Sequence, residues 1–84
     1  MSFAIMTATE LGLAVRKTRQ SLGKSQSWLA EQIGCRRQTI GDLEAGRNVE
    51  IYTLLSILSA LGKGLQIVDI LPDLDNLEAL FSHE

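Results

Sequence analysis

Residues 26–45 read QSWLAEQIGCRRQTIGDLEA and decide the fold of this chain. The apolar residues of the first half recur at helical spacing and stop at Gly34, a residue suited to the left-handed position that ends a helix. A second helix is predicted over residues 37–45, with Ile40 and Leu43 on its inner face and polar residues on its outer face. The stretch therefore predicts two short helices joined by a three-residue turn.

Two further helices are expected on either side of this pair. Thr7 followed three residues later by Glu10 is a capping-box pattern, and it predicts a helix over residues 9–22. Asn48 can cap a fourth helix, which Gly62 and Gly64 would end. The apolar stripe of that helix is typical of a core-facing helix and consists of Ile51, Leu54, Leu55, Leu58 and Leu61.

The chain after the fourth helix has a strand pattern. Residues 65–71, LQIVDIL, are rich in β-branched side chains and are bounded by Gly64 and Pro72. A lone strand leaves backbone groups unpaired, so it must pair with residues 3–6 or with the same strand of a second chain. We favour the second chain, because pairing across a twofold axis also buries apolar side chains, and we expect dimer contacts from Ile67, Val68 and Ile70. The predicted units are a helical domain at 7–62, a dimerising strand at 63–71, and a short C-terminal helix or flexible tail at 72–84.

Length and composition exclude several classes of protein. Eighty-four residues form one small domain, and 45% hydrophobic residues argue against disorder. No apolar run approaches the roughly 20 residues of a membrane span, and the start of the chain lacks a secretion signal, so we expect a cytoplasmic protein. With Cys35 and His83 as the sole residues of their types, no metal cluster of familiar spacing can form, and we expect no cofactor. No nucleophile and base pair or phosphate-binding Gly loop is present, so we expect no enzymatic activity.

Charge is distributed unevenly along the chain. Residues 1–47 hold seven of the eight Lys and Arg against four acidic residues, which leaves +3. The remainder holds Lys63 against six acidic residues, which leaves −5, so the halves account for the net charge of −2. A basic half can face phosphate groups while the acidic half points away, although two solvated faces would give the same pattern.

Residues 10–62 resemble the DNA-binding domain of lambda repressor and Cro, in the wider group of XRE-family regulators. The fold that this resemblance implies is a mainly α helix-turn-helix bundle whose second motif helix enters the DNA major groove. The segment LGLAVRKTRQSLGKSQSWLAEQIG, residues 11–34, together with the strand near 65–71, looks similar to the HipB antitoxin family. That resemblance implies a homodimer that binds palindromic operator DNA, represses its own operon and neutralises a HipA-like kinase toxin.

The resemblance also assigns site residues. At the start of the second motif helix, an Arg can donate to the two acceptors of guanine, and a Gln can pair with the donor and acceptor of adenine. The alternative to these base contacts is that the arginines contact only phosphate. Asp42 can accept from a cytosine amino group or orient Arg37 or Gln38, and both readings stay open. Arg19 and Glu44 match a family pair that joins the first and third helices and is structural. The expected base contacts are Arg36, Arg37, Gln38 and Asp42, and the expected phosphate contacts are Lys24, Gln26, Ser27, Arg47 and Asn48.

Alternatives to the antitoxin function are a stand-alone XRE-family regulator and a protein-interaction module that keeps the fold only as a scaffold. In a protein-interaction module, the acidic half with Leu74, Leu77 and Leu80 would be the surface that binds the partner protein. Strong weakening of binding by salt favours the DNA-binding functions. Gly41, inside the second motif helix, indicates either close backbone approach to DNA or a tolerated defect.

Overall fold

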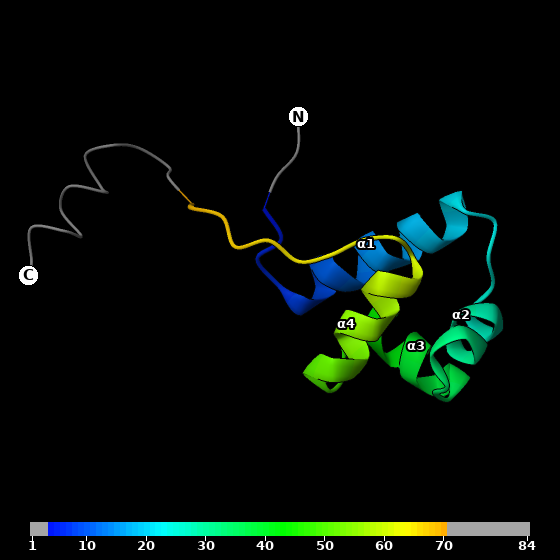
Figure 1. Ribbon diagram of the computed structural model, residues 1–84. Helices are drawn as coiled ribbons and strands as arrows, with labels where there is room; N and C mark the ends of the chain where they lie inside the picture. Colours follow the sequence, from blue (N-terminus) through cyan, green and yellow to red (C-terminus); the bar gives the residue numbers. More distant parts are fainter. Residues whose placement is uncertain (1–3, 71–84) are drawn as a thin grey trace, which may run out of the picture.

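Four helices form the part of the chain that the computed structural model describes, residues 4–70 (Figure 1). They are α1 (Ala8–Ser21), α2 (Gln26–Ile33), α3 (Arg37–Glu44) and α4 (Ile51–Ala60). The mainly α, helix-turn-helix class predicted from the sequence is confirmed, and the first three helices lie within one residue of their predicted bounds. None of the described helices is long and apolar enough to cross a bilayer.

The helix ends follow the predicted capping chemistry, with one exception. Thr7 Oγ1 accepts a hydrogen bond from the Glu10 amide at 3.1 Å, and Ser25 Oγ accepts one from the Trp28 amide at 2.9 Å. Both satisfy amides that the first turn of a helix leaves unpaired. The prediction that Asn48 caps the fourth helix is wrong, because the N-cap is Glu50 and its side chain makes no capping bond. Val49 packs against the core, and the chain stays extended through Glu50 before α4 begins.

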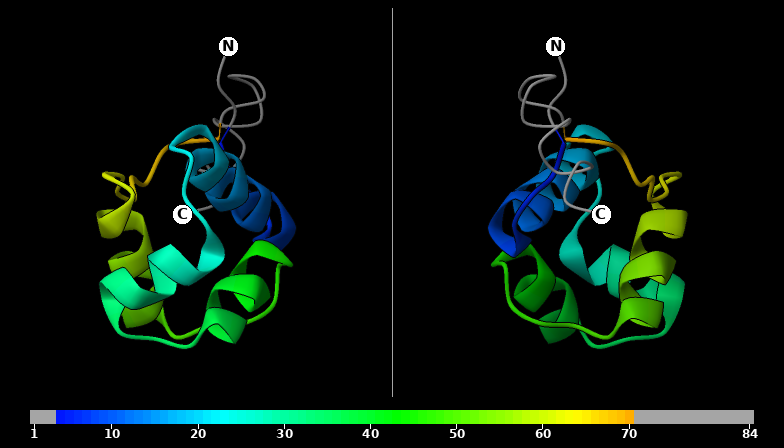
Figure 2. Two further views of the ribbon diagram at one scale, coloured as in Figure 1. Left: turned by 90° about the vertical axis from the view of Figure 1, so that its right-hand side faces the viewer. Right: turned by 90° about the vertical axis from the view of Figure 1, so that its left-hand side faces the viewer.

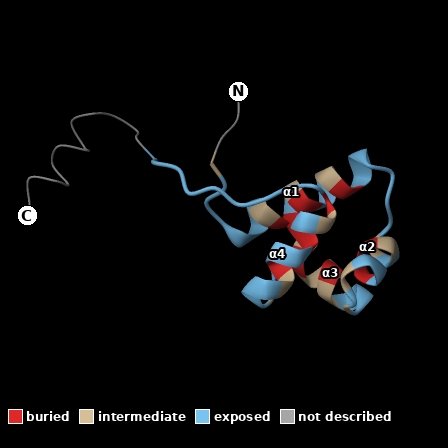
Figure 3. Ribbon diagram, in the orientation of Figure 1, coloured by how far each residue is buried: buried red, intermediate tan, exposed pale blue. Residues whose placement is uncertain are grey.

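The core lies where the inner faces of the four helices meet (Figure 3). Leu29 from α2, Ile40 from α3 and Ile57 from α4 are fully buried. Trp28 and Cys35 are partly buried and pack against this cluster. Among residues 4–70, the buried apolar side chains are Val15, Leu29, Ala30, Ile40, Leu43, Leu54, Ile57, Leu58 and Leu61.

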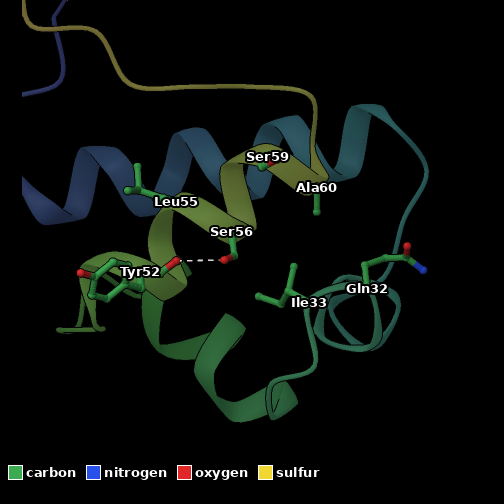
Figure 4. A pocket seen from close by; sticks show the side chains of 7 residues that line it. All are labelled: Gln32, Ile33, Tyr52, Leu55, Ser56, Ser59 and Ala60. Carbon is green, nitrogen blue, oxygen red and sulfur yellow. Dashed lines mark hydrogen bonds between the residues drawn. The ribbon is translucent and has the colours of Figure 1, made fainter.

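The predicted core stripe of α4 is partly wrong. Ile51 is 57% exposed and Leu55 is 43% exposed, whereas Ile57, which the stripe omitted, is fully buried. The reason is that α4 packs on one side only, so residues on its other flank border an open hollow of about 580 Å³ between α2 and α4 (Figure 4). Tyr52 and Leu55 lie on that flank, with Ile33 of α2 opposite them.

The predicted strand is absent from the described residues, in which no strand of any kind occurs. Residues 65–70 instead run as an extended, exposed segment, with Ile67 100% exposed (Figure 1). Ala4 and Ile5 lie close enough to share an apolar hollow of about 520 Å³ with this segment, but residues 4–6 form no ladder with it. Because a strand requires a hydrogen-bonded neighbour, one chain leaves the segment extended and unpaired. Leu71 and the predicted tail at 72–84 lie outside the described residues.

Gly12 sets the distance between α1 and α3. A Cβ at this buried position would lie 2.7 Å from the carbonyl oxygen of Glu44 and closer still to that of Leu43. Backbone atoms cannot rotate away as a side-chain tip can, so any side chain at residue 12 must push the two helices apart. Ala30 of α2 is a second small residue that is buried in the core.

Replacing Gly12 with Ala should therefore destabilise the domain, although Ala favours helix more than Gly does. We expect Gly12→Ala to lower the free energy of unfolding by about 1–3 kcal/mol, the usual cost of overpacking. Gly41→Ala is the matched control, because a Cβ there meets open space, and it should raise the free energy of unfolding by about 0.5–1 kcal/mol. Urea denaturation followed by Trp28 fluorescence measures both. Equal stabilisation by the two substitutions would contradict the close contact at Gly12.

Candidate nucleic-acid interface

The turn between α2 and α3 holds these two helices side by side (Figure 2). Gly34 ends α2 with φ 72° and ψ 35°, the left-handed conformation that glycine adopts without strain. The Cys35 amide donates to the Ala30 carbonyl at 3.0 Å, and Arg36 is extended as the N-cap of α3. Burial raises the pKa of the Cys35 thiol, which lowers its reactivity and fits a packing role. The predicted three-residue turn is confirmed.

The outer face of α3 begins with three exposed polar residues, Arg36, Arg37 and Gln38. One turn further on, Asp42 Oδ1 accepts hydrogen bonds from Gln38 Nε2 at 2.9 Å and from Arg47 Nη1 at 3.3 Å. Of the readings left open for Asp42, the structure supports an orienting contact to Gln38. The contact to Arg47 was not foreseen, because Arg47 follows Gly46, after the helix has ended.

A hollow of about 490 Å³ lies at the N-terminus of α2, and it is lined by residues of three helices. The backbone amides of Gln26 and Ser27 make no hydrogen bond to the described residues. Free amides at a helix N-terminus attract anions, and the arginines beside them reinforce this attraction. We call this site the basic hollow, and its lining consists of Arg16, Arg19, Ser25, Gln26, Ser27 and Arg37.

Arg16 is the residue of the basic hollow that the sequence analysis missed. It is exposed, and it lies on α1 three residues before Arg19, which also lines the hollow. Residues three apart share a helix face, so this spacing was the available signal. Arg37 enters the same hollow from α3, which places one expected base contact beside two expected phosphate contacts, Gln26 and Ser27.

Beneath the basic hollow, Glu44 receives hydrogen bonds from two other helices. Arg19 Nε and Nη2 donate to the two carboxylate oxygens at 2.7 and 2.9 Å, and Gln26 Nε2 donates to Oε1 at 3.1 Å. Arg19 Nη1 also donates to the Lys24 carbonyl at 2.8 Å. The predicted bridge between the first and third helices is confirmed, and we call Arg19, Gln26 and Glu44 the Glu44 network.

The pKa values of this pair show which forces act on it. Burial acts to raise the pKa of Glu44, but hydrogen bonds from Arg19 and Gln26 and the charges of Arg19 and Arg16 outweigh burial and lower it. The hydrogen bond to Glu44 raises the pKa of Arg19 further above its ordinary value. Both groups therefore stay charged at neutral pH, and the bidentate geometry compensates for the loss of water.

The remaining expected phosphate contacts lie at the two ends of the motif. Lys24 precedes α2, with its Nζ 4.8 Å from the centre of the Trp28 ring. Arg47 and Asn48 follow α3, and Asn48 shares a hollow of about 400 Å³ with Thr39. All three expected contacts are exposed, so each is accessible to a ligand.

Comparison with known proteins identifies the family. The family described as Helix-turn-helix matches residues 15–68, which is more than half of the chain. The chain belongs to the helix-turn-helix family. No curated protein is significantly similar to it in sequence.

Solved structures of helix-turn-helix proteins resemble this one closely. HipB in a HipA–HipB–O2–O3 complex matches with a TM-score of 0.77 and 31% identity, over 83% of this chain and 100% of that chain. HipB in a complex with an O4 20mer matches with the same values. The restriction-modification controller protein C.AhdI from Aeromonas hydrophila matches with a TM-score of 0.63 and 33% identity, over 67% of this chain and 86% of that chain. The chain is thus an XRE-type, DNA-binding helix-turn-helix regulator, and the expectation that it is not an enzyme is confirmed.

Removing the charge of Glu44 should destabilise this helix-turn-helix domain. Glu44→Gln leaves the guanidinium of Arg19 without its counter-ion, and we expect it to lower the free energy of unfolding by about 3–5 kcal/mol at pH 7. The folded-state pKa of Glu44 is depressed, so its contribution is complete above the unfolded pKa. That contribution is lost as pH falls through the lower folded pKa.

The difference in unfolding free energy between the native protein and Glu44→Gln should therefore shrink as pH falls below 4.5, the ordinary value for Glu. Urea denaturation at pH 7 and at several acidic pH values measures this difference. Glu31→Gln, at an exposed acid of α2, is the control and should change stability little at any pH. A pH-independent difference for Glu44→Gln would contradict the assigned ion pair.

Proposed function

We propose that this regulator is a dimeric, sequence-specific repressor of its own operon and the HipB-like antitoxin of a toxin-antitoxin pair. The observation that supports the DNA-binding part best is the basic hollow, where two free amides and three arginines adjoin the exposed start of α3. A DNA phosphate on these amides would place the polar face of α3 against the major groove.

In this proposal, the base contacts come from the start of α3. Arg36 and Arg37 can each donate two hydrogen bonds to guanine, and Gln38 can pair with adenine. Arg37 also borders the basic hollow, so the alternative for this residue is a phosphate contact. Asp42 acts beside Gln38, to which it is hydrogen-bonded.

The phosphate contacts of the proposal begin at the basic hollow. The Gln26 side chain already donates to Glu44, so Gln26 would hold the phosphate through its backbone amide and its second side-chain N–H. Arg16 joins the set, because it lines the same hollow. The full proposed set is Arg16, Lys24, Gln26, Ser27, Arg47 and Asn48.

The extended segment at residues 65–70 supports the proposed dimer. Ile67, Val68 and Ile70 are exposed, and the backbone here is unpaired within the described chain. Pairing with the same segment of a second copy would satisfy the backbone and cover these side chains in one step. The proposed units remain the domain at 7–62, the dimerising strand at 63–71 and the tail at 72–84.

The antitoxin part of the proposal is supported by structural similarity. HipB, which shares 31% identity with this chain, occurs in a complex with HipA and operator DNA. The second candidate is a stand-alone regulator, which the comparable identity of 33% to a restriction-modification controller protein favours. Co-expression with a HipA-like kinase separates the two candidates, since only an antitoxin should retain the kinase through purification.

Salt-dependent binding to its own upstream DNA tests the central claim. In a mobility shift at 50 and 200 mM salt, the native protein should bind this DNA more tightly than random DNA. The affinity should fall steeply with salt, because binding releases the counterions of the contacted phosphates. No binding by the folded protein would instead favour the protein-interaction module.

Two alanine variants test the division of roles at the interface. Arg37→Ala should weaken operator binding by about 1–3 kcal/mol and relax the preference at one base pair. Lys24→Ala should weaken binding to all sequences alike and reduce the salt slope by about 1. Titration of operator and random DNA measures both variants. A uniform loss for Arg37→Ala would assign that residue to phosphate contact.

A charge in the extended segment tests the dimer. Val68→Asp places a carboxylate in the proposed two-stranded contact, so light scattering should give half the mass of the native protein. Tyr52→Asp makes the same change from a neutral to a negative side chain at an exposed position of α4, outside residues 63–71, and serves as the control. A native protein that is already monomeric, or a Val68→Asp variant that stays dimeric, would refute pairing through this segment.

A further inference from the structure

The contact between Gln38 and Asp42 restricts how α3 can read a base. Gln38 Nε2 lies 2.9 Å from Asp42 Oδ1, four residues along the same exposed helix face. A carboxylate only accepts hydrogen bonds, so the nitrogen of the amide, and not its oxygen, must face Asp42. The orientation of the Gln38 amide is therefore fixed, because a flipped amide would place Gln38 Oε1 against Asp42 Oδ1, and both atoms are acceptors.

Asp42 is itself held in place by the chain that follows α3. Arg47 Nη1 donates to the same carboxylate oxygen at 3.3 Å, and the Arg47 backbone amide donates to the Asp42 carbonyl at 2.8 Å. The Arg47 side chain is 67% exposed, so its other N–H groups remain free for solvent or phosphate. Its positive charge also offsets the carboxylate, which reduces the repulsion between Asp42 and a DNA backbone.

We propose that Asp42 is a positioning residue that makes Gln38 select a base carrying an amino group in the major groove, with adenine preferred. This inference rests on the proposed function, in which Gln38 contacts a base. With one N–H engaged by Asp42, Gln38 has its Oε1 and one N–H left for DNA. Adenine offers an amino donor and the N7 acceptor and so matches both groups, whereas cytosine offers the amino donor alone.

The same arrangement disfavours the two keto bases. Guanine presents two acceptors, N7 and O6, to the major groove, and thymine presents the O4 acceptor. On either base Gln38 Oε1 finds no donor, so Gln38 can make at most the one bond that its free N–H donates, and the amide cannot turn over without losing its contact to Asp42. Discrimination therefore arises as much from this mismatch as from the favourable pairing with adenine.

A double-mutant cycle on Gln38 and Asp42 tests the inference. The operator is varied one base pair at a time, and binding of each variant DNA is measured by competition. Asp42→Asn keeps the size of the side chain but can donate as well as accept, so it frees the Gln38 amide to turn over. Asp42→Ala is the second variant, because it removes the acceptor altogether.

We expect the native protein to prefer adenine at one position, and Gln38→Ala to abolish that preference. Asp42→Asn and Asp42→Ala should each reduce the adenine preference over guanine at that same position by about tenfold. In the Gln38→Ala background, neither Asp42 substitution should change any base preference. Thermal unfolding checks that every variant is folded.

The alternative outcomes distinguish failure of the inference from failure of the proposed function. If Asp42→Asn merely tightens binding to every sequence, then Asp42 acts through its charge alone, and the inference is overturned while the base contact of Gln38 stands. If Gln38→Ala changes no base preference, the base contact is wrong and the inference falls with it. If the folded native protein binds no DNA, the proposed function itself fails.

Discussion

The arrangement of the motif depends on the ion pair between Arg19 and Glu44. Helices as short as α2 and α3, with eight residues each, are not stable alone in water, so their orientation must come from contacts between them. Glu44 receives Arg19 from α1 and Gln26 from α2, and it belongs to α3 itself. The ion pair also requires a small residue at position 12, since only glycine lets α1 approach the last turn of α3 without a steric clash. One buried carboxylate thus fixes three helices relative to one another.

The Glu44 network also determines the electrostatics of the basic hollow above it. The charge of Arg19 is largely balanced by Glu44, with which it makes a bidentate contact. The positive charge available to an incoming anion therefore comes from Arg16 and Arg37, which line the hollow together with the N-terminal residues of α2. Gln26 belongs to both the network and the hollow, because its side chain donates to Glu44 and the residue also lines the basic hollow. The network that holds the helices together is therefore directly connected to the anion-binding surface.

Local signals predicted the features that depend on neighbours in sequence. The cap at Thr7 and the turn at Gly34 follow from side-chain and backbone chemistry within a few residues, and both were confirmed. Features that depend on packing between distant segments were predicted less well. The burial of Ile57, the helix contact at Gly12 and the place of Arg16 in the basic hollow require knowledge of which helix lies opposite. The family resemblance supplied the pair of Arg19 and Glu44, which spacing alone does not indicate.

Charge and symmetry together explain why this chain would need two copies to act on DNA. Its net charge is −2, so the attraction to phosphate comes from a local excess in residues 1–47 and not from the whole molecule. A single α3 with a few arginines offers a small interface, and such interfaces bind weakly. In the proposed dimer, pairing of residues 65–70 joins two such surfaces at a fixed distance, so the second contact costs little further entropy. The exposed apolar segment would thus join the two protomers, and each protomer would supply one half of the DNA-binding surface.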